Sequence, residues 1–257
     1  MTVRTGPGSS LQELEDWYRS PLGTEVAALE SVCVQRLLND TFGYYLIQVG
    51  MAESFRDALA ASRIRHRLSM RCEQTSAAQG RTLVGLPNAL PFGADAVDAI
   101  LLPHTLDFWP DPRAVLREVE RVLIPDGRVI ILGFNALSAW GLWSLLPGVG
   151  RRVPWCGHFR TAYQIEDWLS VLGFDLEVRE HIMFRPPWRR AMGPSCAAFD
   201  RLGQRFWSIL GGVYVIRAVK RVATLTPIRP AWNRRRALLP GRAVEPTTRR
   251  SGHARVR

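Results

Sequence analysis

His104 and Asp107 are two residues whose types and spacing could support chemistry. They lie three positions apart, directly after the apolar run from Ala96 to Leu102. An imidazole titrates near neutral pH, so His104 could act as a general base toward a substrate hydroxyl or carbon acid. Asp107 could orient that imidazole or bind substrate. The alternative for both side chains is ordinary packing or solvation.

A second candidate is the aromatic segment from Asn135 to Arg160, which contains Trp140 and Trp143 one helical turn apart. Two tryptophans at this spacing share one face of a helix, which could line a substrate pocket for an apolar or aromatic molecule, or meet a bilayer surface. A lid helix packed on the core is the other interpretation. Arg151 and Arg152 beside them could contact an anionic group or remain solvated.

These residues must be positioned by a framework, and the hydrophobic pattern predicts one of alternating strands and helices. Seven short apolar runs are predicted as strands: 44–49, 67–72, 82–86, 96–102, 128–134, 174–179 and 213–218. Helices are predicted between and before them, at 10–18, 24–38, 53–62, from Pro112 toward Pro125 and from Thr161 toward Gly173. Asp111 and Thr161 are the expected N-caps of the last two helices.

Strands that alternate with helices predict an α/β fold. The specific expectation is a Rossmann-like, doubly wound, mostly parallel seven-stranded sheet with helices on both faces, because parallel neighbours need crossover connections. Such sheets bind ligands at the carboxyl ends of their strands. The predicted site therefore lies in the loops after Val49, Cys72, Leu86 and Leu102.

The chain is expected to hold one main domain with appendages. The predicted boundaries are a helical cap at residues 1–40, the sheet domain at 41–227 with an insertion at 135–160, and a basic, disordered tail at 228–257. The tail carries nine arginines against one acid, Glu245, out of a net charge of +11 for the whole chain. A solvated tail and weak contact with RNA or anionic lipid both remain open.

Other classes of protein receive little support from the composition. The four cysteines are widely separated and form no CxxC pair, so neither a metal site nor a disulfide framework is predicted. The longest apolar stretch, Ala136 to Leu146, is about half the length that spans a bilayer. The first residues lack the apolar core of a secretory signal, so a cytoplasmic location is expected.

Three motifs in fixed order carry a resemblance to a known family. They are Leu90-Pro91-Phe92 before the fourth strand, Pro110-Asp111-Pro112 at the next helix, and Leu123-Ile124-Pro125-Asp126-Gly127-Arg128 before the fifth strand. Together the stretch resembles the class I S-adenosylmethionine (SAM) methyltransferases of the type 11 family, which includes ubiquinone and menaquinone biosynthesis enzymes. The motifs are mainly architectural, since they open a helix and turn the chain.

The resemblance implies SAM as the cofactor and places it against the strand ends. The implied cofactor-binding residues are Gln48, Gly50, Ala52, Glu73, Leu86, Pro87, Asn88 and Pro103. The cofactor motifs are degenerate, because Gln48 stands where the family usually presents an acid and only Gly50 remains of the glycine-rich loop. Glu73 is the candidate for the ribose hydroxyls, and the acid after the third strand is missing.

The sequence thus predicts a SAM-dependent methyltransferase that acts on a small, apolar or aromatic acceptor, with His104, Asp107, Trp140 and Trp143 on the acceptor side. The first alternative is a catalytically inactive binding or regulatory protein on the same scaffold, which the altered acidic positions favour. The second is a nucleic-acid-associated protein that works through its arginine tail.

Overall fold

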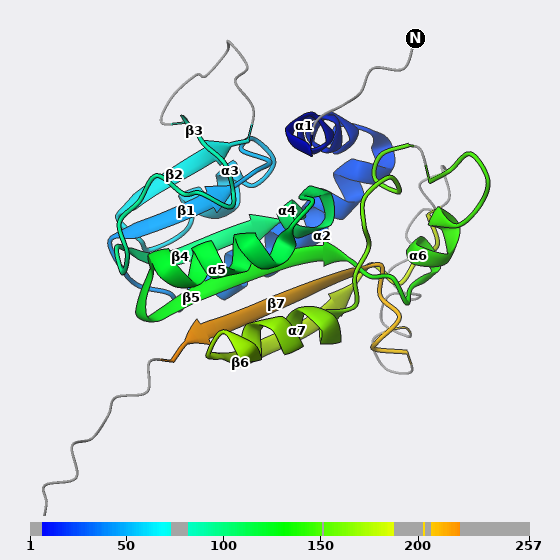
Figure 1. The fold of residues 1–257 in the computed structure, drawn as a ribbon. Coiled ribbons are helices and arrows are strands. Elements are labelled where there is room, and N and C mark those ends of the chain that lie inside the picture. Colours follow the sequence, from blue (N-terminus) through cyan, green and yellow to red (C-terminus); the bar gives the residue numbers. More distant parts are fainter. Residues whose placement is uncertain (1–6, 73–81, 151, 188–202, 204–206, 222–257) are drawn as a thin grey trace, which may run out of the picture. The chain divides into compact units, whose positions relative to one another are not determined.

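The fold is built on one seven-stranded sheet, seen in a computed structural model that describes residues 7–72, 82–150, 152–187, 203 and 207–221. The strand order is β3-β2-β1-β4-β5-β7-β6 (Figure 1). In chain order the strands are β1 Tyr45–Val49, β2 His66–Arg71, β3 Thr82–Val84, β4 Val97–Pro103, β5 Leu123–Phe134, β6 Phe174–Ile182 and β7 Val213–Lys220. All seven overlap the predicted strands.

The sheet is mixed, so the expected parallel pairing holds for five of the seven strands. The pairings among β1 to β5 are parallel, whereas β7 runs antiparallel to both β5 and β6. Neighbouring antiparallel strands need no crossover helix between them. The α/β class and the central place of β1, between β2 and β4, agree with the prediction.

Seven helices whose bounds are described surround this sheet. They are α1 Pro7–Trp17, α2 Pro21–Leu38, α3 Arg56–Ala60, α4 Thr105–Phe108, α5 Pro112–Val122, α6 Ala139–Ser144 and α7 Ala162–Val171. The predicted N-caps are confirmed: Asp111 accepts a hydrogen bond from the backbone of Ala114, and Thr161 accepts one from Gln164. None of the described helices has the length and apolar character needed to cross a membrane.

Alternate strand residues point to opposite faces of the sheet and form two hydrophobic clusters. Leu46 and Leu101 pack with α1, α2 and α3, whereas Ile47 and Ile100 pack with α5 and α7. The N-terminal helices therefore contribute to one face of the core. This burial of both faces explains why the central strands read as continuous apolar runs rather than as alternating ones.

Two predicted elements have other bounds in the structure, and two short helices were not predicted. The helix expected at 53–62 is limited to α3, and the short helices α4 and α6 were not predicted. β5 starts at Leu123 rather than at 128, because an irregularity between the Val97 and Ala99 pairings accommodates the Pro-Asp-Gly sequence. Asp126 has φ of 61° there, and a Cβ on Gly127 would lie 2.8 Å from the carbonyl oxygen of Ile124.

Candidate functional site

The loop after β1 begins at Gly50, at the centre of the predicted site. Gly50 has φ of 81° and Met51 has φ of 44°, so the chain turns through two left-handed residues in succession. The Gln48 amide donates hydrogen bonds to the carbonyl oxygens of Gly50 and Met51, which hold this turn. The other end of that amide, Oε1, is buried and has no hydrogen-bond partner among the described residues.

Helix α1 covers this loop. Leu11 lies so close that a Cβ on Gly50 would meet its side chain at 3.4 Å, and Glu15 accepts a hydrogen bond from the backbone N–H of Glu53. Burial raises the pKa of the Glu15 carboxyl, and the backbone hydrogen bond from Glu53 opposes that rise. The cavity left between α1 and the loop measures about 10 Å³, so α1 fills the place next to Gly50.

His104 stands at the end of β4 in the left-handed conformation, with φ of 54°. Such a backbone is uncommon outside glycine and is a feature of sites where the structure fixes a side chain. His104 is fully buried, and both ring nitrogens contact carboxylates: Nε2 lies 2.9 Å from Glu30 and Nδ1 lies 3.2 Å from Asp107. Glu30 comes from α2 and also accepts a hydrogen bond of 2.7 Å from the Tyr18 hydroxyl.

This cluster sets the protonation of His104. Burial alone lowers the pKa of an imidazole, but the charge of Glu30 and the hydrogen bonds to Asp107 and Glu30 outweigh it and raise the His104 pKa from 6.5 to about 9. The pKa of Tyr18 is also raised well above 10, by burial and by the charge of Glu30. His104 is therefore an imidazolium at neutral pH in this arrangement.

Asp107 connects the cluster to the neighbouring strand. Its Oδ2 accepts a hydrogen bond of 2.8 Å from the backbone N–H of Phe134, whose ring stacks on His104 at 4.1 Å between centroids. Its Oδ1 is buried without a hydrogen-bond partner among the described residues. Thr105, two residues before Asp107, donates a hydrogen bond of 2.6 Å to the carbonyl oxygen of Val49. This bond joins the tips of β1 and β4. Two unpartnered acceptors, from Gln48 and Asp107, thus lie at adjacent strand tips.

The structure brings many of the predicted residues to this edge of the sheet. Six of them follow or end β1 and β4: Gln48, Gly50, Ala52, Pro103, His104 and Asp107. Three form the turn after β3: Leu86 and Asn88, which are exposed, and Pro87, which is buried. Glu73 lies outside the described residues. Among the described residues, no group of three or more His, Cys, Asp and Glu side chains is arranged to hold a metal ion.

The two candidate tryptophans differ in environment. Trp140 is fully buried, donates a hydrogen bond of 2.8 Å from its indole nitrogen to the carbonyl oxygen of Arg185, and stacks between Phe134 and Trp155. It belongs to the core. Trp143 instead lines an open cavity, so the spacing that made the pair look equivalent does not give the two side chains one role.

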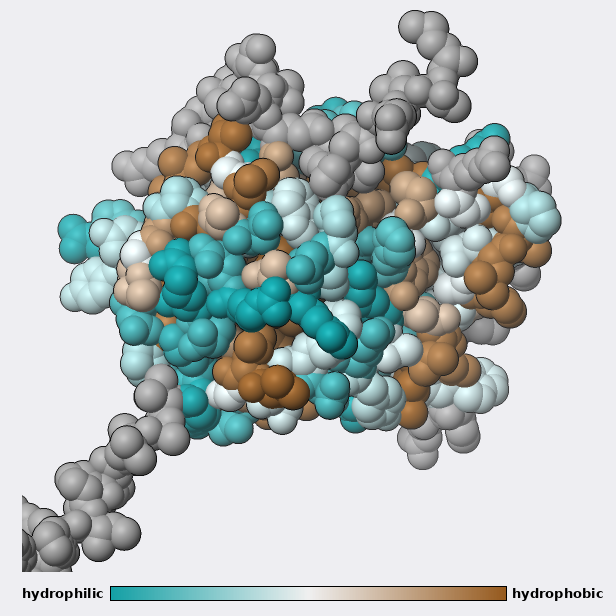
Figure 2. All heavy atoms as spheres, in the orientation of Figure 1, coloured by the Kyte–Doolittle hydropathy of each residue, from teal (hydrophilic) through white to brown (hydrophobic). Residues whose placement is uncertain are grey.

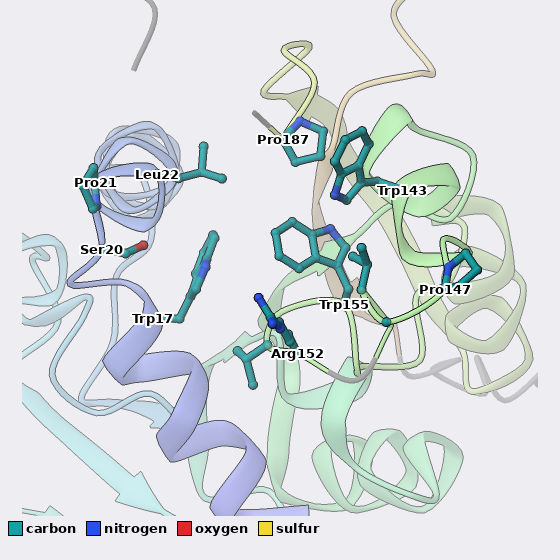
Figure 3. Close-up of a pocket in the computed structure, with 12 residues that line it drawn as sticks. Trp17, Ser20, Pro21, Leu22, Trp143, Pro147, Arg152, Trp155 and Pro187 are labelled. Carbon is teal, nitrogen blue, oxygen red and sulfur yellow. The ribbon is translucent and has the colours of Figure 1, made fainter. Parts of the chain in front are cut away.

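That cavity has a volume of about 810 Å³ and is lined mainly by apolar and aromatic residues. Figure 3 shows Trp17 from α1 facing Trp143 and Trp155 across the open space, with Arg152 below them and Pro187 at the opposite rim. The indole nitrogen of Trp155 is buried and has no hydrogen-bond partner among the described residues. We call this space the tryptophan cavity.

Several functional candidates were missed from the sequence, and all come from the first 30 residues. They are Glu15, Trp17, Tyr18 and Glu30. One of them carried a signal: Glu30 falls on the same helical face as Val26, Val34 and Leu37, where a carboxylate is out of place unless it has a buried partner.

The matches in sequence include a methyltransferase family and a plant methyltransferase. A family model described as a methyltransferase domain matches residues 43–131. The protein YafS of Escherichia coli (strain K12) is 34% identical over 215 residues, which cover 79% of this chain and 82% of YafS. The chloroplastic 2-methyl-6-phytyl-1,4-hydroquinone methyltransferase of Spinacia oleracea is 28% identical over 81 residues, 29% of this chain and 24% of that protein.

Solved structures share the fold. A SAM-dependent methyltransferase of Thermotoga maritima, described as a possible histamine N-methyltransferase, superposes with a TM-score of 0.61 at 19% identity and covers 83% of this chain and 97% of its own. A geranyl diphosphate methyltransferase in complex with GPP and sinefungin gives a TM-score of 0.54 at 16% identity, over 75% of this chain and 77% of its own. At these identities the likeness concerns the fold.

Proposed function

The chain belongs to the class I SAM-dependent methyltransferases, and from this we propose that it transfers a methyl group from SAM to a small apolar or aromatic acceptor. SAM, when bound, supplies an electrophilic methyl group on a sulfonium ion. The protein then needs mainly to bind and align a nucleophile, which requires little dedicated catalytic machinery. The observation that carries the proposal is the pair of unpartnered acceptor oxygens at the adjacent tips of β1 and β4, on Gln48 and Asp107.

The chemistry of these strand tips fits a cationic donor molecule. Glu30, Asp107 and the protonated His104 together carry one net negative charge, which favours a cation nearby. Oε1 of Gln48 and Oδ1 of Asp107 are buried without a hydrogen-bond partner among the described residues, and we propose that they accept hydrogen bonds from the ammonium group of SAM once it is bound. Gln48 brings no charge of its own, so the buried cluster supplies what the replaced acid would have contributed.

The size of the cleft does not fit SAM while α1 is in place. A cavity of about 10 Å³ holds no more than a water molecule, and ligand pockets are typically some 300 Å³ or larger. We therefore propose that α1 moves away when SAM binds, so that Leu11 leaves Gly50 and Glu15 releases the N–H of Glu53. Because Trp17 of the same helix also lines the tryptophan cavity, this movement would connect the donor cleft to that cavity.

The tryptophan cavity is our proposed acceptor site. Its volume suits a small molecule, and Trp17, Trp143 and Trp155 offer flat apolar surfaces for an aromatic ring or an apolar chain. The free indole N–H of Trp155 and the guanidinium of Arg152 could orient a polar or anionic end. Acceptors with apolar chains are named for the plant hydroquinone methyltransferase and for the geranyl diphosphate enzyme.

Within the site, Asp107 and His104 receive different proposed roles. Oδ1 of Asp107 is free to contact a ligand, whereas His104 holds Asp107 and Glu30 together. General-base catalysis by His104 stays a prediction, and it requires that the imidazole first lose its proton and one carboxylate contact. The cofactor roles of Gly50, Ala52 and Pro103 likewise stay predictions.

Other predictions concern residues away from this cluster. Contact of Leu86, Pro87 and Asn88 with the adenine, and of Glu73 with the ribose, remains proposed, as does a cytoplasmic location. Weak binding of RNA or anionic lipid by residues 228–257, outside the described part of the chain, is proposed from their arginine content alone.

A second candidate function is supported by the closed cleft. If α1 stays on Gly50, the protein is a binding or regulatory protein that uses the tryptophan cavity without SAM. The loss of two loop glycines, replaced by Ala52 and Ser54, and the hydrogen bond between Glu15 and Glu53 both favour that state.

Isothermal titration calorimetry with SAM and with its demethylated product separates the two functions. The methyltransferase predicts saturable binding of both, and Asp107→Asn should weaken the binding of SAM about tenfold, because a charged acceptor is lost. Asp126→Asn, at an exposed carboxylate, is the matched control and should leave the affinity unchanged. Absence of heat and of any thermal shift at millimolar SAM would leave only the second function.

A further inference from the structure

Exposed leucines gather on the insertion between β5 and α7. Leu137, Leu142, Leu145 and Leu146 have 53%, 69%, 78% and 45% of their surface exposed. Large apolar residues are also exposed on the segment before β7, where the values are 54% for Trp207, 42% for Ile209 and 47% for Leu210. We call these seven residues the insertion patch. Apolar groups of this size concentrated on a surface commonly mark a binding face.

The two chain segments that carry the insertion patch contact each other. The Asn135 side chain donates hydrogen bonds of 2.7 Å to the carbonyl oxygen of Ile209 and 2.9 Å to that of Gly211. Gly212 lies against the indole of Trp140, since a Cβ there would come within 2.7 Å of its ring. In Figure 1 the chain before β7 passes beside α6, and Figure 2 shows hydrophobic surface at that side of the molecule.

The leucines have no role in the core beneath them. Trp140 and Gly141 form the buried side of α6, and this short helix leaves Leu142 and Leu145 on its outer side. Replacing them with polar residues would therefore remove nothing from the interior. Their exposure leaves them accessible to a partner.

The charge of the surrounding sequence favours one kind of partner. Residues 135–160 contain three arginines and no aspartate or glutamate, and Arg152 among them is exposed. Leucine and tryptophan side chains combined with arginines and almost no acids suit the interface of an anionic bilayer, where apolar groups enter the acyl region and cations meet the headgroups. A protein partner of matching shape would not require this one-sided charge.

We propose that the insertion patch docks on the surface of an anionic lipid bilayer. Trp143 and Arg152 of the tryptophan cavity belong to the same insertion, so docking would bring the lining of the cavity close to the lipid. An apolar ligand could then pass between bilayer and cavity without crossing water. The docking itself depends neither on SAM nor on the proposed methyl transfer.

Vesicle flotation with the full chain tests the proposal. The chain should bind vesicles of phosphatidylcholine that contain one fifth phosphatidylglycerol, and bind pure phosphatidylcholine at least tenfold more weakly. The double variant Leu142→Gln and Leu145→Gln should lose at least tenfold in affinity for the anionic vesicles, with an unchanged melting temperature. The matched control is Val171→Gln on α7, a residue 80% exposed outside the insertion patch, which should bind as the unmodified chain does.

Three outcomes would overturn the proposal. Binding to anionic vesicles that the double variant retains, and that 0.5 M salt removes, would assign lipid binding to the arginine tail alone. A dimer in sedimentation that the double variant dissociates, without vesicle binding, would make a second copy of the chain the occupant. Failure of the unmodified chain to bind any vesicle would also refute it. None of these results depends on SAM, so each is separate from a failure of the methyltransferase proposal.

Discussion

Among single residues, His104 defines the electrostatics of the interior. An imidazolium with a carboxylate on each ring nitrogen is stabilising only while both contacts persist, because a buried charge left unpaired is costly. The same arrangement leaves Oδ1 of Asp107 free at the strand tip. The residue that the sequence suggested as a base therefore holds two buried carboxylates in this structure, and its catalytic role stays a prediction.

The raised pKa of His104 predicts how stability depends on pH. The folded protein keeps the proton up to about pH 9, whereas the unfolded chain releases it near 6.5. The stabilisation is therefore complete below pH 6.5 and is lost as pH rises through 9. The free energy of unfolding should fall over this range by up to about 3 kcal/mol, measured by urea denaturation at several pH values.

Glu30→Gln removes the largest interaction that raises this pKa and should flatten the dependence on pH. Asp126→Asn at an exposed carboxylate provides the control and should keep the slope of the unmodified protein. A slope that is the same in Glu30→Gln as in the unmodified protein would show that other groups cause the dependence.

Among the elements, α1 has the largest consequence for function. Leu11 and Glu15 of α1 close the cleft beside Gly50, and Trp17 of the same helix lines the tryptophan cavity. Ligands change an equilibrium only through their different affinities for its states. If SAM displaces α1, as proposed above, the energy that holds α1 in place is subtracted from the binding energy of SAM. The affinity for SAM should therefore report on the contacts of α1.

Glu15→Ala removes the acceptor for the N–H of Glu53 and should strengthen SAM binding about three- to tenfold, as expected for the loss of one hydrogen bond from the closed state. Calorimetry measures the change. Glu13→Ala on the exposed side of α1 alters charge equally and should have no effect. Weaker binding in Glu15→Ala would mean that Glu15 supports the bound state instead.

At the scale of the whole molecule, the chain divides into two units, residues 1–222 and residues 223–257. The two hydrophobic clusters are formed by residues between Leu11 and Ala218, and residues up to Val222 form one compact unit. The nine arginines beyond Pro227 account for most of the net charge of +11. Deleting the arginine-rich segment should therefore change the net charge without changing the compact unit.

Removal of residues 228–257 should leave the melting temperature within about 2 °C, because the compact unit that ends at Val222 stays whole. Scanning calorimetry of the shortened and full-length chains makes the comparison. Binding to a polyanion such as heparin should weaken strongly, since most of the net charge is gone. A fall of 10 °C or more would show that the tail stabilises the folded unit.

The sequence by itself determined the seven strands, most of their helices and the place of Gly50 at a strand tip, because periodic apolar patterns and turn residues act locally. The Leu90, Pro110 and Leu123 motifs gave the family for the same reason. The antiparallel placement of β7, the burial of Trp140 and the pairing of His104 with Glu30, 74 positions away, were decided only by tertiary structure. Whether a charged or aromatic side chain faces solvent, a cavity or a partner depends on which distant segment packs against it, and no local pattern of residues encodes that.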